Sequence, residues 1–144
     1  MAMTVEEFVQ HCDGVADELD RMNFQDALEE CIPILQEGFT DNFALSRAPD
    51  GTPWAPRKNT KAQNPILILT SELLRSVGGQ TGDSIERIDD TVLTLGTKDK
   101  KAAFHEHGTK HMVARPFMGV DESKLDECEE VLARHFGNIL AGER

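Results

Sequence analysis

Pro116 and the residues around it constrain the fold most strongly, because a helix cannot run through them. The segment 114–121 reads Ala-Arg-Pro-Phe-Met-Gly-Val-Asp. Proline fixes its own φ, lacks an amide hydrogen and disfavours helical backbone at the preceding residue. Phe117 and Met118 form a short apolar run between a proline and a glycine, which predicts a buried strand. Asp121 suits the N-cap of a following helix. The segment therefore predicts a core strand that leads into a C-terminal helix.

Three stretches of apolar residues recur at the three- and four-residue steps of amphipathic helices. The first follows Thr4 and Glu7, whose spacing is that of a capping box that opens a helix. The second spans residues 27–43 and contains Pro33, which predicts either a kink or a new helix start. The third predicts a last helix over roughly 122–141. Long helices should therefore form both ends of the chain.

The chain has 144 residues, of which 39% are hydrophobic, so residues 1–144 can bury a core as a single domain. An odd number of cysteines without a Cys-x-x-Cys pair indicates a reduced, cytoplasmic setting. All three lie on apolar stripes of the predicted helices and are expected in the core: Cys12, Cys31 and Cys128. No apolar run approaches the ~20 residues that cross a bilayer, so we expect no membrane partner.

A long segment without periodicity separates the N-terminal helices from the rest of the chain. Residues 47–65 consist largely of turn-forming residues around Pro-Asp-Gly and Trp54. Structureless connections beyond ~12–15 residues are uncommon in compact domains and are usually either functional or disordered. An aromatic side chain as large as Trp54 seldom stays in water, so this loop should be held against some surface.

The residues after the loop predict a small sheet. A short helix carries Leu73, and residues 84–88 and 91–95 predict two strands of a hairpin whose register stays ambiguous. A helical turn should end at Gly108. The predicted fold class is α+β: an antiparallel sheet with a hairpin, covered by two long N-terminal helices and a C-terminal helix, plus one extended loop or arm over 46–65.

The net charge of −11 is spread unevenly along the chain. Residues 1–46 carry eleven acidic side chains and one basic one, whereas the loop over 47–61 is basic. Stable binding of phosphate backbones requires clustered Lys and Arg, which this balance does not supply. The acidity predicts either an ordinary solvated surface or an adaptor domain that binds a basic partner.

One group of residues could carry chemistry. In an extended segment His105 and His107 would share a face and could bind a metal, with His111 or Glu106 completing the site. On a helical turn the side chains of His105 and His107 would instead point about 160–200° apart, at ~100° per residue. This group supports an alternative hypothesis, a small metal-dependent hydrolase that uses His105, His107 and His111.

Three separated motifs together resemble the phage virion morphogenesis family, the tail-completion and head-tail joining proteins of Mu-like phages. They occur in this order: Pro-Asp-Gly-Thr-Pro-Trp-Ala-Pro over 49–56, Ile-Leu-Thr-Ser-Glu-Leu-Leu-Arg-Ser-Val over 68–77, and Ala-Ala-Phe-His-Glu-His-Gly-Thr over 102–109, followed by Ala-Arg-Pro-Phe-Met-Gly. The resemblance covers about residues 24–140. The chain departs from it where the family has a tyrosine and this sequence has Lys101 or Ala102.

The resemblance implies a structural virion protein without catalysis and without a cofactor. It would assemble in the host bacterial cytoplasm as a ring of identical copies in the neck, beside portal-side or tail-tube proteins, with DNA passing through without specific binding. The implied structural core residues are Leu73, His105, Gly108, Pro116 and Phe117.

The loop 47–65 is the hypothetical interaction arm of such a ring. A closed ring needs one patch of each subunit to meet a different patch of the next, and this chain offers a basic loop and acidic helices. Trp54 would anchor the contact, with Arg57, Lys58 and Lys61 at its rim. The alternative is a loop folded back on its own domain, with Trp54 covering the core.

Overall fold

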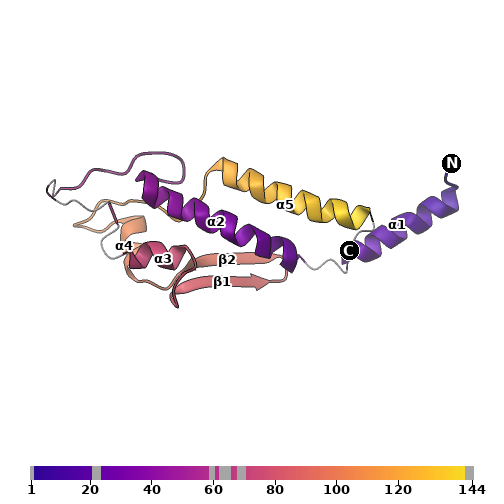
Figure 1. Ribbon diagram of the computed structural model, residues 1–144, viewed down its shortest axis with the longest axis horizontal. Coiled ribbons are helices and arrows are strands. Elements are labelled where there is room, and N and C mark those ends of the chain that lie inside the picture. The colour runs from indigo at the N-terminus through magenta and orange to yellow at the C-terminus, as the bar shows by residue number, and fades with distance from the viewer. Residues whose placement is uncertain (1, 21–23, 59–60, 62–65, 68–70, 142–144) are drawn as a thin grey trace.

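The computed structural model describes residues 2–20, 24–58, 61, 66–67 and 71–141. Helices flank a single β-hairpin in this part of the chain (Figure 1). In chain order the elements are α1 (Val5–Asp20), α2 (Gln25–Leu45), α3 (Glu72–Val77), β1 (Ser84–Asp89), β2 (Val92–Thr97), α4 (Lys101–His107) and α5 (Glu122–Leu140). The arrangement confirms the predicted α+β class. None of the described helices is long and apolar enough to cross a membrane.

The antiparallel pairing of β1 with β2 settles the register that the sequence left open. Leu93 pairs with Ile88 and Leu95 pairs with Glu86, so these side chains share one face of the hairpin. Leu95 packs against the core, and the Gln36 amide of α2 donates a hydrogen bond of 2.6 Å to the Glu86 carboxylate. This face of the hairpin therefore lies toward α2.

Aromatic side chains form the centre of the core. Phe43 of α2 and Phe117 are fully buried, and their ring centroids are 4.9 Å apart. The buried core cluster comprises Phe39, Phe43, Trp54, Leu73, Val77, Ala102 and Phe117. The helix that supplies Phe39 and Phe43 continues through Pro33 as one element of 21 residues, so the alternative of a new helix start at Pro33 is wrong.

α5 begins as predicted and packs along α2. The Asp121 side chain accepts a hydrogen bond of 3.2 Å from the Lys124 amide, which confirms the predicted N-cap. Polar pairs connect the two helices: the Lys124 ammonium lies 2.9 Å from the Glu37 carboxylate, and Arg134 and His135 both contact the Glu30 carboxylate. The C-terminal helix thus rests on α2, which separates it from α3 (Figure 1).

The segment around Pro116 is not a strand, so that prediction is wrong, although Phe117 is buried as expected and Pro116 and Met118 are half-buried. In a sheet, backbone carbonyls of a neighbouring strand would accept hydrogen bonds from the amides of this segment, but here a side chain accepts them. The amides of Phe117 and Met118 donate hydrogen bonds of 2.9 Å and 3.1 Å to the same carboxylate oxygen of Glu106. A side chain of α4 therefore satisfies backbone groups that a neighbouring strand would otherwise have paired.

α1 begins with the predicted capping box, but its apolar stripe is exposed. The Thr4 amide donates to the Glu7 carboxylate at 2.7 Å, and the Glu7 amide donates to the Thr4 hydroxyl at 3.2 Å. The helix lies beyond the far ends of α2 and α5 and contacts α5 (Figure 1). Cys12 is exposed, so its predicted core position is wrong. Periodicity shows which side chains share a helix face, but not whether another element covers that face.

Candidate functional site

The first part of the predicted arm, residues 46–58, lies against its own domain. Trp54 is 7% exposed and belongs to the core cluster. Its indole N–H donates a hydrogen bond of 2.8 Å to the Pro116 carbonyl, and its ring meets Phe43 edge-on at 5.8 Å. The structure thus shows the folded-back arrangement for this part of the loop. Residues 59–60 and 62–65 lie outside the described residues.

Arg115 holds the end of this segment in place. Its Nε donates a hydrogen bond of 3.0 Å to the Ala55 carbonyl, and its Nη2 donates one of 3.1 Å to the Pro56 carbonyl. The Arg115 amide in turn donates to the His105 carbonyl at 2.7 Å. One side chain therefore joins the loop to the segment after α4, which gives the surface between them a fixed shape.

A pocket of about 320 Å³ lies on this surface and is called the basic pocket below. Its lining residues are Pro56, Arg57, Lys58, His111, Met112, Val113 and Arg115. The structure brings two of the predicted rim residues, Arg57 and Lys58, together in this pocket, whereas Lys61 is exposed and does not line it. Sequence reasoning missed Arg115, Met112 and Val113, because no local pattern indicates a contact between segments about 60 positions apart.

The histidines do not form a metal site in the described part of the chain. No group of three or more His, Cys, Asp or Glu side chains converges there in a way that could hold a metal ion. His107 and His111 are exposed, whereas His105 is half-buried and its Nδ1 atom has no hydrogen-bond partner among the described residues. Burial, and then the nearby Arg115 charge, lowers the pKa of His105 below its ordinary value, which favours the neutral ring.

The residues assigned to the structural core occupy two environments. Leu73 and Phe117 are buried at 6% and 0% exposure, and Pro116 accepts the hydrogen bond from Trp54. Gly108 ends α4 with φ at +74°, where a Cβ would lie 2.8 Å from the backbone nitrogen of Ala114. Leu73 and Phe117 therefore serve packing, the Pro116 carbonyl serves as an acceptor for Trp54, and Gly108 serves the close approach of two backbone segments.

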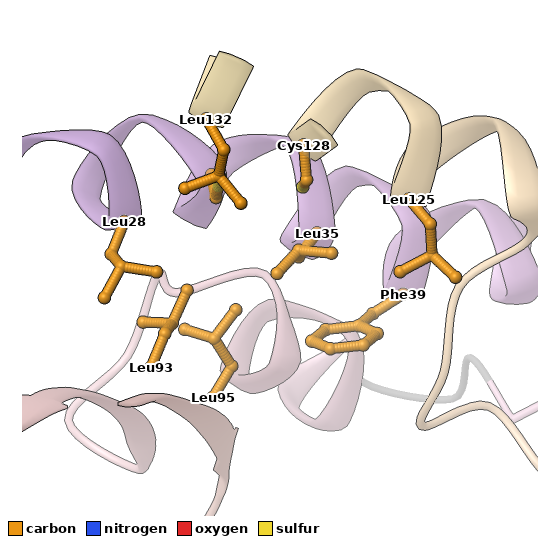
Figure 2. A pocket seen from close by; sticks show the side chains of 9 residues that line it. Leu28, Leu35, Phe39, Leu93, Leu95, Leu125, Cys128 and Leu132 are labelled. Carbon is orange, nitrogen blue, oxygen red and sulfur yellow. The ribbon is translucent and has the colours of Figure 1, made fainter. Parts of the chain in front are cut away.

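An apolar groove of about 370 Å³ runs between α2, α5 and β2 (Figure 2). Its lining residues are Leu28, Cys31, Leu35, Phe39, Leu93, Leu95, Leu125, Cys128 and Leu132. Burial, together with a hydrogen bond that the neutral Cys128 thiol donates to Cys31, raises the pKa of the Cys128 thiol to about 12. At neutral pH the Cys128 thiol is therefore protonated and a poor nucleophile.

Comparison with known proteins adds a family and one relative. A model of the phage virion morphogenesis family matches residues 10–137. The curated Mu-like prophage FluMu G protein 1 of Haemophilus influenzae is 25% identical over 121 residues, which cover 82% of this chain and 83% of that protein. No solved structure is a significant match to the chain.

Proposed function

The chain belongs to the phage virion morphogenesis family, and we propose that it is a structural subunit of the head-tail connector that acts by assembling into a ring. The ring would complete the tail or join the tail to the head, without catalysis. Its neighbours would be other neck proteins on the portal side or the tail-tube side. Assembly would take place in the cytoplasm of the host bacterium, and the ring would remain in the virion.

The unequal distribution of charge over the subunit is the observation that carries this proposal. The loop segments 46–58 and 108–115, whose residues line the basic pocket, lie at one end of an elongated molecule, and the acidic helix α1 lies at the other end (Figure 1). A ring needs two different, complementary patches on each subunit, and opposite charges at opposite ends supply such a pair. A subunit with the same charge over its whole surface would repel its own copies.

Electron microscopy and mass measurements of the purified chain test this proposal. We expect closed rings when the chain is concentrated or mixed with its neck partners. A phage that lacks the chain should accumulate separate heads and tails, and the intact gene supplied from a plasmid should restore joined particles. Complete, infectious particles formed without the chain would contradict the proposal.

DNA that passes through such a ring should meet a surface that does not retain it. The net charge of −11 repels the phosphate backbone, and tight binding through counterion release would require clustered Lys and Arg. We expect no submicromolar binding of the chain to duplex DNA at physiological salt. Fluorescence anisotropy of a labelled duplex measures this directly, with a basic DNA-binding protein as the positive control. Submicromolar binding would contradict passive passage.

A further inference from the structure

The exposed apolar side chains of α1 require a partner. Val5, Phe8, Val9 and Cys12 recur at helical spacing and form one face, called the α1 stripe below. Val5, Phe8 and Val9 are 79%, 58% and 50% exposed. Most of the stability of a protein helix comes from packing its apolar face, and isolated helices of about this length are marginal in water. Another surface should therefore cover the α1 stripe.

The polar residues of α1 restrict the chemistry of that surface. The helix carries six acidic side chains and neither Lys nor Arg in its sequence Val-Glu-Glu-Phe-Val-Gln-His-Cys-Asp-Gly-Val-Ala-Asp-Glu-Leu-Asp. A surface that covers the stripe while lying close to these carboxylates should combine apolar and cationic groups. An acidic surface would add repulsion to the contact.

The basic pocket has this combination of groups. Arg57, Lys58 and Arg115 supply positive charge, and no acidic side chain is among the described residues that line the pocket. Its apolar part includes Met112 and Val113, of which Val113 is 51% exposed. The hydrogen bonds of Arg115 to the loop carbonyls hold the walls in place, so a bound helix would not have to order them.

The apolar groove between α2, α5 and β2 fits α1 less well. On α5 the exposed Asp126 and Glu129 directly follow the lining residues Leu125 and Cys128. A helix as acidic as α1 would meet like charges beside this groove, and juxtaposed like charges oppose association. Charge therefore distinguishes the two apolar surfaces and favours the basic pocket.

We propose that α1 of one copy docks through its stripe on the basic pocket of the next copy. Because α1 lies at the end of the subunit opposite the loop segments 46–58 and 108–115 that carry the basic pocket, each copy can give α1 to one neighbour and receive α1 from another (Figure 1). This inference rests on the proposed ring and names its contact. The arm is then α1, while loop residues up to Lys58 form part of the receiving surface.

Two single-sided variants of the full chain test the docking. Phe8→Gln removes the largest side chain of the stripe, and Val113→Asp places a carboxylate in the pocket. Both residues are more than half exposed, at 58% and 51%, so circular dichroism should show an unchanged fold. Each variant alone should associate at least about tenfold more weakly than the unmodified chain, as expected from the loss of one buried apolar contact. The matched control is Val92→Asp, which alters a valine of 58% exposure on the hairpin.

Mixing the two variants gives the sharpest result. Phe8→Gln keeps an intact pocket, and Val113→Asp keeps an intact α1. In an equimolar mixture, α1 of the Val113→Asp chain can dock on the pocket of the Phe8→Gln chain, but the reverse contact is impaired. The mixture should therefore form dimers and no larger species. Analytical ultracentrifugation distinguishes dimers from rings and monomers. If the mixture remains monomeric, or if Leu125→Asp in the groove prevents assembly while Val113→Asp does not, the docking is overturned.

Cys12 supplies a second measurement that needs no substitution. It lies on the α1 stripe and is exposed in the single subunit, so it should react with a maleimide in monomers and be protected in rings. Rings that form normally while Cys12 stays reactive would overturn the docking and leave the ring proposal intact. A chain that remains monomeric at every concentration, with and without its neck partners, would overturn both.

Discussion

Replacing Phe117 with alanine should lower the free energy of unfolding by about 3–5 kcal/mol. The side chain is fully buried, and its ring centroid lies 4.9 Å from that of Phe43, so truncation removes apolar contacts and leaves a cavity. Small domains have a total stability of only about 5–15 kcal/mol. The variant should therefore melt at a much lower temperature, as measured by circular dichroism or calorimetry.

The matched control for this variant is Phe104→Ala. Phe104 is 53% exposed on α4, so the same change of side chain removes little buried surface. We expect its melting temperature to stay close to that of the unmodified chain. Equal destabilisation by the two variants would mean that burial in the monomer does not account for the effect of Phe117.

Gly108→Ala should destabilise the chain by at least about 2 kcal/mol. The residue has φ at +74° and ψ at 174°, a backbone conformation that side chains rarely adopt. An added Cβ would also lie 2.8 Å from the Ala114 nitrogen and 2.9 Å from the Met112 carbonyl oxygen. Both neighbours are backbone atoms, so relief would require the segment after α4 to move. Urea denaturation of the variant measures the loss.

Gly137→Ala makes the same change at a site without these constraints. Gly137 lies inside α5, and a Cβ there would meet none of the described residues within 4 Å. Because alanine favours helix over glycine, this variant should gain up to about 1 kcal/mol of stability. We therefore expect Gly108→Ala to lower the free energy of unfolding and Gly137→Ala to raise it. A loss at Gly137 as large as that at Gly108 would refute the backbone explanation.

Local chemistry was sufficient to predict where α1 and α5 begin. Thr4 with Glu7, and Asp121 before α5, are signals contained within four residues, and the structure has both caps. The turn at Asp90 also follows from local sequence, because short hairpin connections favour residues that tolerate positive φ, here 54°. Each of these features depends only on neighbours in the sequence.

The remaining features depend on contacts between distant segments. The apolar run at Phe117 and Met118 predicted a strand, but Glu106 from α4 pairs their amides instead. Likewise, Arg115 lines the basic pocket because its side chain donates hydrogen bonds to the carbonyls of Ala55 and Pro56. Spacing within a segment contains no information about such partners.

The arrangement around Trp54 gives the protein a built-in optical probe. The chain has one tryptophan and no tyrosine, so its near-ultraviolet fluorescence comes essentially from a single indole. That indole is 7% exposed, packs on Phe43 and donates a hydrogen bond to the Pro116 carbonyl. Its emission maximum should therefore shift to longer wavelength when the loop separates from the core, because water then reaches the ring. Because Trp54 is buried within its own subunit, assembly of subunits should leave the emission spectrum nearly unchanged. A variant that unfolds should therefore shift the emission maximum, whereas a variant that only fails to assemble should not.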